Sequence, residues 1–455
     1  MATAPRSRLA QRVKHTLEHG LRATFSALEV RNYRLFFAGQ AVSQIGTWMQ
    51  SVAISWLAYE LSHSATTVGL VLAAQFLPLL VLGAYGGVVA DRLPRRPLLI
   101  ATQGGLGILA LMLGLLSLSG SIALWALFCV AAAIGIVLTV DNPGRQSFVI
   151  ELVGADRVQN AVGLNSVLVN ASRAIGPAIA GGLIATVGVG VCFVANAASF
   201  IAVLMALALI RSTELHPTTP IARARGQLRQ GLRYVRATRG LLVPLLMMAL
   251  IGTLAYEFPV VLPALAHRSL AGGAGTFGLL TSAMGVGAVV GGLAVAAVGL
   301  TGQRPLTIAA LAFGVTILVA AVMPTVPLEL GALALVGAGS TGFMATGNST
   351  LQLTTDPLFR GRVMALWAVM FQGTTPIGGP IIGVVAQHAS PRAALALGGV
   401  ACLLAAGLGA AARDHRRSGR HARFRQAIAP DRDPSGSVAG SVSDDAAAGL
   451  EAGDG

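Results

Sequence analysis

The sequence predicts an all-α membrane protein with twelve transmembrane helices in two pseudo-symmetric six-helix bundles. Three observations lead to this prediction: a composition that is 54% hydrophobic and only 11% charged, a series of long apolar runs, and a repeat that relates the two halves of the chain. A soluble globular protein carries about a quarter charged residues. The absence of alternating hydrophobicity over short segments argues against an outer-membrane barrel.

Twelve apolar runs mark the predicted spans, and many reach the roughly 20 residues that a helix needs to cross a bilayer. The first run begins near Leu35 and is too long for the core of a cleavable signal peptide, so we expect it to remain as a span. The predicted spans are 35–61, 66–90, 97–118, 121–141, 158–186, 190–210, 241–266, 275–300, 305–323, 328–353, 361–387 and 392–412.

The basic residues predict the topology. With the N-terminus in the cytoplasm, 29 of the 32 Lys and Arg residues fall in cytoplasmic segments. This asymmetry predicts a multi-pass protein with both termini in the cytoplasm. Arg far outnumbers Lys, which is typical of a GC-rich bacterium and favours a bacterial inner membrane. The net charge of +14 lies in these loops, so it favours lipid phosphates over nucleic acid as partners.

The two halves of the chain repeat one another. The Asn-x3-Gln pattern at Asn142 returns 206 residues later at Asn348, and the Gly-Pro pair at Gly176 returns 203 residues later at Gly379. A duplicated unit of this size implies a pseudo-two-fold axis along the membrane normal, with a seam where a transporter would bind its substrate. The predicted parts are a cytoplasmic N-terminal segment (1–34), an N-terminal six-helix bundle (35–210), a basic amphipathic linker on the inner membrane surface (211–240), a C-terminal six-helix bundle (241–412) and a disordered cytoplasmic tail (413–455).

A single lysine, Lys14, restricts the energy source. A P-loop places a Lys on the phosphates of ATP, so the chain cannot carry that nucleotide site. The three cysteines lie singly in apolar runs and match no metal spacing. No combination of nucleophile and base can be argued. We therefore expect no enzyme, no cofactor and no metal, and we expect an ion gradient to drive the protein.

A charged motif follows the second predicted span. Its spacing is Gly-x3-Asp-Arg-x2-Arg-Arg. The alternative to a functional motif is an ordinary basic loop on the cytoplasmic side. Its members are Gly87, Asp91, Arg92, Arg95 and Arg96. The motif resembles motif A of the major facilitator superfamily, although Pro94 stands where that motif usually has Gly or Ala. The resemblance implies a gate that latches the two halves on the cytoplasmic side.

Repeat symmetry adds a prediction about the carboxylate of this gating motif. Asp91 is expected near the cytoplasmic start of the eleventh span, close to Arg360 or Arg362. An aspartate at a membrane boundary can also interact favourably with a helix N-terminus.

Small residues and a proline mark the fifth span. They are Gly163, Ser172, Gly176, Pro177 and Gly181. They predict a closely packed helix that can kink. Close packing alone is the alternative interpretation, because Gly and Pro are common in membrane helices. The pattern resembles the superfamily's antiporter motif C, with Ser172 and Ala180 in place of two glycines, and this resemblance implies an exporter.

Three further stretches narrow the resemblance. NYRLFFAGQAVSQIGTWMQ, DNPGRQSFVIELV and FPVVLPALA are similar to the drug:proton antiporter branch that includes macrolide efflux proteins and the enterobactin exporter. The resemblance implies secondary active export of a drug, siderophore or other metabolite by proton antiport with alternating access. An importer or uniporter on the same fold, and a non-transporting receptor or lipid-handling protein, are the alternatives. The expected partners are a small-molecule substrate, protons and the bilayer, with the chain as a monomer.

Charged residues inside the predicted spans are few. Glu257 is the one carboxylate deep within a span, and Arg173 is the one cation. A charge at the bilayer centre costs at least about 2.5 kcal/mol, so both are functional candidates. Glu257 is the first candidate for proton coupling, and Asp141, predicted at the end of the fourth span, is the second. Structural hydrogen bonds are the alternative role for Glu257 and Arg173.

Polar and aromatic residues within the spans are candidates for the substrate cavity, because such cavities combine aromatic surface with a few polar anchors. Hydrogen bonds that bridge helices are the alternative role for many of them. The candidates are Gln44, Trp48, Gln50, Asn165, Asn170, Arg173, Tyr256, Asn348, Trp367 and Gln372.

Overall fold

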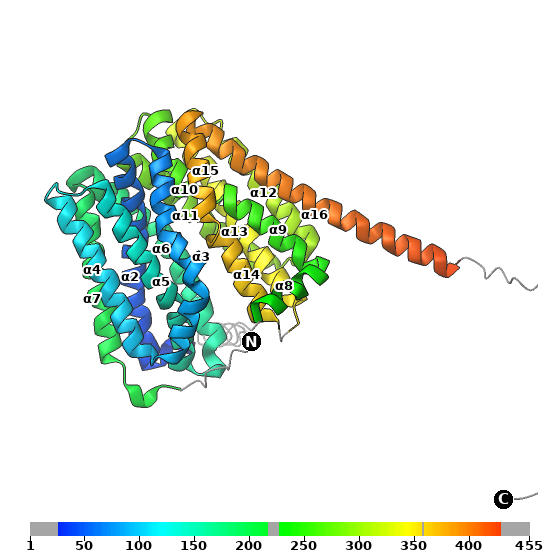
Figure 1. The fold of residues 1–455 in the computed structure, drawn as a ribbon, viewed down its shortest axis with the longest axis horizontal. Coiled ribbons are helices and arrows are strands. Elements are labelled where there is room, and N and C mark those ends of the chain that lie inside the picture. The colour runs from blue at the N-terminus through cyan, green and yellow to red at the C-terminus, as the bar shows by residue number, and fades with distance from the viewer. Residues whose placement is uncertain (1–25, 217–226, 357–358, 429–455) are drawn as a thin grey trace, which may run out of the picture. The chain divides into compact units, whose positions relative to one another are not determined.

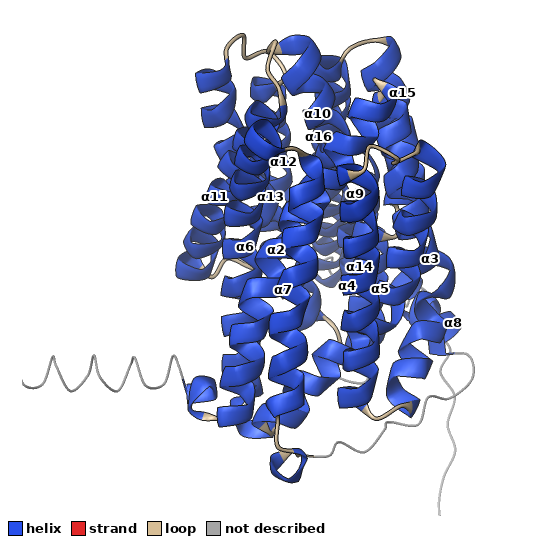
Figure 2. Ribbon diagram, turned by 90° about the vertical axis from the view of Figure 1, so that its left-hand side faces the viewer, coloured by secondary structure: helices blue, strands red, loops and turns tan. Residues whose placement is uncertain are grey.

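Helices make up all the regular structure in the residues that the structure describes. The computed structural model describes residues 26–216, 227–356 and 359–428, and no strand occurs among them (Figures 1 and 2). The prediction of an all-α fold is therefore confirmed. The first half of the sequence forms η1 (Ser26–Glu29), α2 (Arg31–Ser62), α3 (Ala65–Arg92), α4 (Arg95–Leu118), α5 (Leu124–Val153), η2 (Ala155–Arg157), α6 (Val158–Val187), α7 (Val189–Leu209) and η3 (Ser212–Glu214). The second half forms α8 (Gln227–Ala237), α9 (Arg239–Leu254), α10 (Phe258–Ala264), the π-helical turn η4 (Leu265–Ser269), α11 (Ala274–Val298), α12 (Gln303–Ala320), α13 (Val326–Thr354), α14 (Arg360–Gln372), α15 (Thr375–His388) and α16 (Pro391–Ile428).

Eleven segments of the described chain are long and apolar enough to cross a membrane, and they match the predicted spans from the second to the twelfth. The helix at the first predicted span, α2, has 32 residues, which also suffices to cross a bilayer. Its hydropathy is lower because it carries polar residues such as Gln40, Ser43 and Gln50, which are buried against other helices. With α2, the helices complete the predicted set of twelve.

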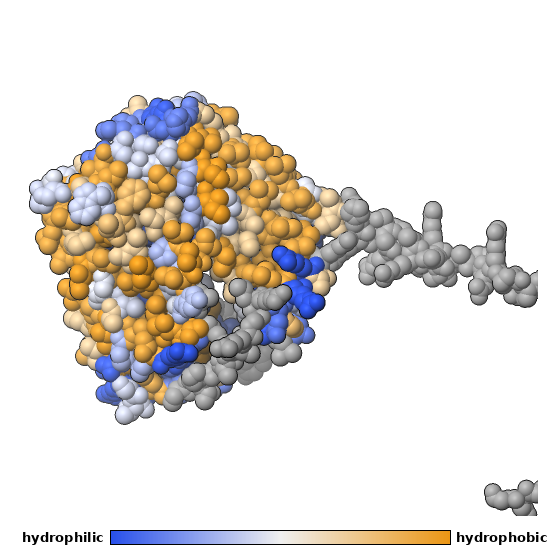
Figure 3. Space-filling model, in the orientation of Figure 1, coloured by the Kyte–Doolittle hydropathy of each residue, from blue (hydrophilic) through white to orange (hydrophobic). Residues whose placement is uncertain are grey.

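Figure 3 shows the surface expected of such a protein. Hydrophobic residues cover a broad band of the visible face, and hydrophilic residues gather at its upper and lower edges. Large apolar side chains lie exposed on many helices, among them Ile108, Leu293 and Leu404. A band of exposed apolar side chains fits a surface that faces lipid, because lipid tails are as apolar as these side chains.

One end of the helical body contains His63 and the other contains Arg95, and they are called the His63 end and the Arg95 end. At the His63 end, α2 passes into α3 and α10 is followed by η4. At the Arg95 end, α3 passes into α4, and α8 precedes α9. Within the first half, α2 packs on α6 and α7, α4 packs on α7, and α3 packs on α5. Within the second half, α11 and α12 pack on α13, and α9 packs on α14 and α15.

The two halves touch mainly through two helix pairs, α6 with α11 and α3 with α15. In the first pair, a Cβ atom on Gly278 would clash with the Cα atom of Gly181. In the second pair, a Cβ atom on Gly383 would lie 2.7 Å from the carbonyl oxygen of Ala65. Small residues allow such close approach of membrane helices. These contacts lie toward the His63 end, where α3 and α11 begin and where α6 and α15 end.

Two predicted spans are broken in the structure, which corrects the expectation of single helices over 241–266 and 361–387. The first divides into α9 and α10, and the second into α14 and α15. A proline explains each break, because its ring displaces the carbonyl group four residues earlier and it lacks an N–H. Pro259 stands four residues after Ala255, which caps the end of α9, and Pro376 stands four residues after Gln372, the last residue of α14.

The fourth predicted span is longer than expected. It was predicted to end at Asp141, but α5 continues to Val153 and contains Pro143. Asp141 therefore lies inside a helix and not at its end. The polar residues that suggested a loop stay helical because they form hydrogen bonds with neighbouring helices, and membrane helices tolerate a proline under such conditions.

The segment predicted as a basic linker contains the helix α8. Within α8, Val235 is buried whereas Arg233 and Arg236 are exposed, so its described residues are amphipathic. Tyr234 stacks on Phe359 with ring centroids 4.3 Å apart, which fixes α8 beside the start of α14. Residues 217–226 of the linker lie outside the described residues.

The contacts divide the chain into two compact units, one up to Ala412 and one from Arg413 onward. α16 extends to Ile428, so the first part of the segment predicted as a disordered tail is helical. Arg, which is frequent there, is a strong helix former. Residues 1–25 and 429–455, which belong to the predicted terminal segments, lie outside the described residues.

Candidate functional site

A cation lies between the two halves of the helical body. Arg173 on α6 places its guanidinium carbon 4.8 Å from the centre of the Trp48 ring on α2. Its own backbone packs against the other half, because a Cβ atom on Gly285 of α11 would lie 2.6 Å from the carbonyl oxygen of Arg173. Arg173 also interacts electrostatically with Tyr256, at the break between α9 and α10. The structure thus brings three predicted cavity residues together.

Tyr256 contributes an aromatic wall from the second half. Its hydroxyl donates a hydrogen bond to the carbonyl oxygen of Ser340 on α13, at 2.8 Å. Its ring contacts those of Phe313 and Phe371, at centroid distances of 5.3 and 5.0 Å. Arg173, Trp48, Tyr256 and Phe371 are each only partly buried. A positive charge and three partly exposed rings, contributed by both halves, are therefore candidates for contact with a small molecule.

Glu257, the next residue after Tyr256, points toward α15. It is 3% exposed and precedes the first residue of α10. A Cβ atom on Gly378 would lie 3.1 Å from Oε1 of Glu257, and one on Gly379 would lie 3.6 Å from Oε2. Thr375, the first residue of α15, lies near the carboxyl group. Gly379 itself packs against Gly69 of α3, so the carboxyl group lies beside a contact between the two halves.

No cation among the described residues forms an ion pair with Glu257, and its Oε1 atom has no hydrogen-bond partner there. A carboxyl group in such a place can gain or lose a proton without breaking an ion pair. Buried charges are normally paired, so an unpaired carboxyl group at a membrane depth is a candidate for function.

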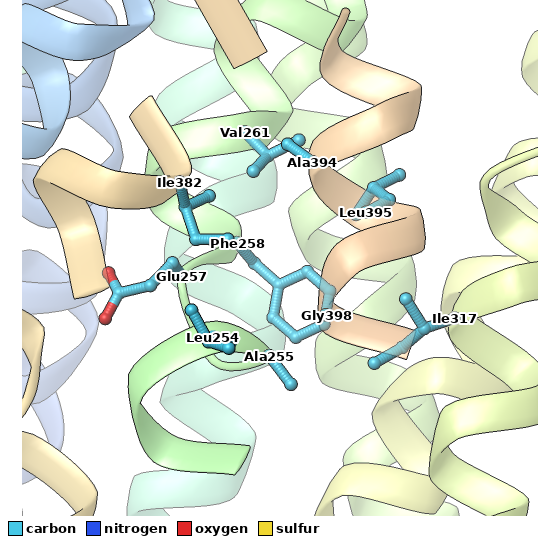
Figure 4. Close-up of a pocket in the computed structure, with 10 residues that line it drawn as sticks. All are labelled: Leu254, Ala255, Glu257, Phe258, Val261, Ile317, Ile382, Ala394, Leu395 and Gly398. Carbon is cyan, nitrogen blue, oxygen red and sulfur yellow. The ribbon is translucent and has the colours of Figure 1, made fainter. Parts of the chain in front are cut away.

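A small apolar cavity lies on the other side of the same helix break (Figure 4). The ring of Phe258 points into this cavity, whereas the carboxyl group of Glu257 points away from it. The lining comes from α9, α10, α12, α15 and α16, namely Leu254, Ala255, Glu257, Phe258, Val261, Ile317, Ile382, Ala394, Leu395 and Gly398. Apart from Glu257 the lining is apolar, so this cavity offers no polar anchor for a substrate.

Asp141, the second proton-coupling candidate, is fully buried in a polar network. Its Oδ1 atom accepts hydrogen bonds from Thr102 at 2.7 Å and from Gln103 at 2.8 Å, both on α4. Its Oδ2 atom lies 3.7 Å from Nη2 of Arg145. Arg145 in turn donates a hydrogen bond to Gln40 of α2, at 3.2 Å. The network joins α2, α4 and α5, and these bonds give Asp141 a structural role that Glu257 lacks.

We expect Asp141→Ala to destabilise the protein by about 1–3 kcal/mol, because it leaves the buried donors of Thr102 and Gln103 without an acceptor. Asp141→Asn keeps an acceptor oxygen and should destabilise the protein less than Asp141→Ala does. Thermal unfolding of the purified protein in detergent measures both changes. Equal stability of the two variants, with proton coupling lost in both, would instead make Asp141 the proton carrier.

The gating motif makes its described contacts within the first half. Arg95 forms an ion pair with Glu151 near the end of α5. Arg96 donates hydrogen bonds to the carbonyl oxygens of Leu207 and Ala208, at 2.7 and 2.8 Å, near the C-terminus of α7. Basic side chains at a helix C-terminus bond its last carbonyls and complement its dipole. Gly87 is buried, Arg92 is exposed, and Asp91 lies at the end of α3.

A role of Asp91 as a latch stays a prediction. We expect Asp91→Asn to lower transport severalfold while the amount of protein in the membrane stays similar, because the loss of one charge at a helix end changes stability little. Arg96→Gln is the comparison, since it removes the bonds to α7 and should reduce the amount of protein. Vesicle transport and immunoblotting measure the two quantities. Full transport by Asp91→Asn would exclude the latch.

The antiporter motif packs α6 on two neighbours. A Cβ atom on Gly176 would lie 2.7 Å from Cβ of Trp48 on α2, and Gly181 meets Gly278 of α11. Ser172 and Pro177 are buried, whereas Gly163 has open space where a Cβ atom would stand. The motif thus sets the distance between the halves and holds Arg173 between them.

The other cavity candidates fall into three groups. Gln50 accepts a hydrogen bond from Asn196 of α7 at 2.7 Å, and Trp367 is buried against Gly347, so these two residues bridge or pack helices. Asn170 and Asn348 form hydrogen bonds within their own helices. Gln44 is partly buried, and Asn165 and Gln372 are exposed.

Sequence reasoning missed Thr102, Gln103 and Arg145, which surround Asp141, and Thr375, which lies near Glu257. Gln103 offered a signal, because it is an amide within a predicted span, as Gln44 and Gln50 are. Arg145 offered none, because the predicted fourth span ended before it.

Comparisons with known proteins agree on one family. The family model described as a transmembrane secretion effector matches residues 22–422. The staphyloferrin A transporter of Staphylococcus aureus (strain NCTC 8325 / PS 47) is 24% identical over 361 residues, which cover 78% of this chain and 89% of that protein. The enterobactin exporter EntS of Shigella flexneri is 27% identical over 380 residues, which cover 82% of this chain and 89% of that protein.

Solved structures show the same fold at low identity. A bacterial homologue of the human lysosomal transporter Spinster, inward-facing and unoccupied, has a TM-score of 0.64 at 13% identity and covers 84% of this chain and 95% of its own. A bacterial homologue of the iron transporter ferroportin, in an inward-facing state, has a TM-score of 0.65 at 15% identity and covers 84% of this chain and 98% of its own.

Proposed function

Because the chain belongs to the transmembrane secretion effector family of the major facilitator superfamily, we propose that it exports a small molecule from a bacterial cytoplasm in exchange for protons. Membership of the family makes the chain a multi-pass membrane transporter. The relatives named above carry siderophores by name, so a siderophore or a similar metabolite is the proposed substrate.

One observation carries the proposed mechanism: the two halves approach each other through glycine contacts that lie toward the His63 end. We assign this end to the outside and the Arg95 end to the cytoplasm, because the basic residues gather at the Arg95 end. Arg173, Trp48 and Tyr256 lie between the halves. Rocking of one half against the other would open this site to each side in turn.

The proton would be carried by Glu257, beside the contact of α15 with α3. A rocking motion that separates these helices would change the surroundings of the carboxyl group. Protonation and opening would then be linked, as the coupling of an ion gradient to transport requires. Asp141 is the second choice, because its carboxylate is occupied by Thr102, Gln103 and Arg145.

Everted membrane vesicles test the direction and the energy source. Staphyloferrin A and enterobactin, the molecules that the relatives are named for, serve as probes. We expect energised everted vesicles that contain the protein to accumulate at least one of them, and a protonophore to abolish the accumulation. Accumulation only in right-side-out vesicles would show an importer, flux that ignores the protonophore would show a uniporter, and no flux of either probe would contradict a siderophore exporter.

A further inference from the structure

We infer that the site between the halves binds the carboxylate of a small organic anion on the guanidinium of Arg173, with a planar part of the ligand against Trp48. This inference rests on the proposed transport function and names the chemical class of its substrate. It differs from the expectation for a pump of cationic drugs, whose cavity would offer a carboxylate to the ligand.

The charge of Arg173 has no partner in the described chain. None of the ion pairs found there includes Arg173, and its guanidinium donates no hydrogen bond to a described residue. Its guanidinium lies over the face of Trp48, and Tyr256 lies within the range of an electrostatic interaction. Its side chain is only partly buried, and none of its nitrogen atoms is among the fully buried atoms that lack a partner, so these donors keep some exposure.

Arg145 is an example of a cation with a structural role in this fold. It also lies inside a span helix of the first half, but it pairs with Asp141 and donates to Gln40 and Asn142. A cation at membrane depth is costly, and such residues normally face a partner or a water-filled cavity. Arg173 lies partly exposed between the halves and has no such partner among the described residues, which points to a ligand as the group that pairs with its charge.

The form of the site favours a planar anion. A guanidinium group presents parallel N–H donors whose geometry matches a carboxylate, and it stacks on aromatic faces at the same time. Trp48 already occupies one face of Arg173, and the accessible rings of Tyr256 and Phe371 stand in the other half. Glu257 follows Tyr256 in the sequence, but its carboxyl group points toward α15, so it does not neutralise the charge of Arg173.

Equilibrium binding to the full chain in lipid nanodiscs tests the inference without any gradient. The probes are salicylate and salicylamide, which share a ring and a hydroxyl group but differ in charge, and the cation tetraphenylphosphonium. We expect salicylate to bind more tightly than the amide. Arg173→Gln should weaken salicylate binding by about ten- to hundredfold, the range for loss of a charged hydrogen bond, and leave salicylamide binding unchanged. Arg173→Lys should lie between, because a lysine keeps the charge and loses the planar donor pair.

Arg304→Gln is the matched control, because Arg304 is an exposed arginine at the start of α12, far along the chain from the site. It should bind salicylate like the unaltered protein. Thermal unfolding in the nanodiscs shows whether the Arg173→Gln variant remains folded. Unchanged salicylamide binding shows that its binding site is intact. Equal affinity for salicylate and salicylamide, unchanged salicylate binding by Arg173→Gln, tighter binding of the phosphonium cation, or no saturable salicylate binding up to about 10 mM would each overturn the inference.

The vesicle and nanodisc experiments separate the two proposals. Salicylate binding that depends on Arg173, without export from the vesicles, would leave the anion site standing and remove the proposed exporter. Export of a siderophore that is unaffected by Arg173→Gln would keep the exporter and remove the anion site.

Discussion

Glu257→Gln is expected to abolish uphill efflux in proteoliposomes, down to the level of liposomes without protein. Glutamine has the shape and hydrogen-bonding groups of a protonated glutamate but cannot release a proton. The buried carboxyl group has no ion-pair partner in the described chain, so its replacement breaks no ion pair. Downhill exchange of substrate should survive, because exchange needs the rocking motion and not the proton. A pH dye inside the liposomes and labelled substrate measure the two processes together.

Two further variants make the Glu257 experiment specific. Glu257→Asp keeps a carboxyl group on a shorter side chain, so part of the coupling should return. Glu60→Gln is the control, because Glu60 is an exposed carboxylate near the end of α2. If Glu257→Gln still pumps against a gradient with unaltered proton coupling, another residue carries the proton, and Asp141 becomes the first to examine.

Gly278→Val is expected to reduce transport at least about tenfold, because a closed contact between α6 and α11 could no longer form. Even a Cβ atom at this position would clash with the backbone of Gly181. A change of about 1.4 kcal/mol in the free energy of the closed state already changes its equilibrium population about tenfold. Valine should hold the halves apart toward the His63 end. A cysteine introduced at Thr281 of α11, in a Cys129→Ser background, should then react faster with a maleimide added from that side.

Gly275→Ala is the matched control for this experiment. It lies one turn earlier on α11, and its Cβ atom would stand 3.6 Å from Cβ of Ala185, an ordinary contact. We expect near-normal transport and unchanged cysteine labelling. Normal transport by Gly278→Val would show that the close approach of α6 and α11 is not part of the cycle. Loss of Gly278→Val from the membrane would show a packing role, which labelling of the residual protein could then confirm.

The sequence predicted the features that depend on neighbouring residues better than those that depend on contacts between distant helices. The all-α fold and the superfamily are confirmed, and eleven of the twelve predicted spans reappear as membrane-spanning segments. The breaks at Ala255 and Gln372 were missed, although Pro259 and Pro376 were visible, because apolar residues on both sides gave one continuous hydrophobic signal. The end of α5 was placed too early, because Asn142 and Arg145 read as a loop until their partners on other helices are known.

The sequence by itself determined where the chain crosses the membrane and which family it belongs to. Hydropathy over about 20 residues and the positions of prolines, glycines and arginines are local properties, and the bilayer allows few structures to satisfy the backbone. Only the tertiary structure decided which side chains meet. Asp141 was predicted at the end of a span and Arg173 inside one, but both lie within helices, where packing surrounds Asp141 with donors and leaves Arg173 on Trp48 between the halves. The reason is physical: the direction of a side chain from a helix, and the helix that it faces, depend on how the helices pack in three dimensions.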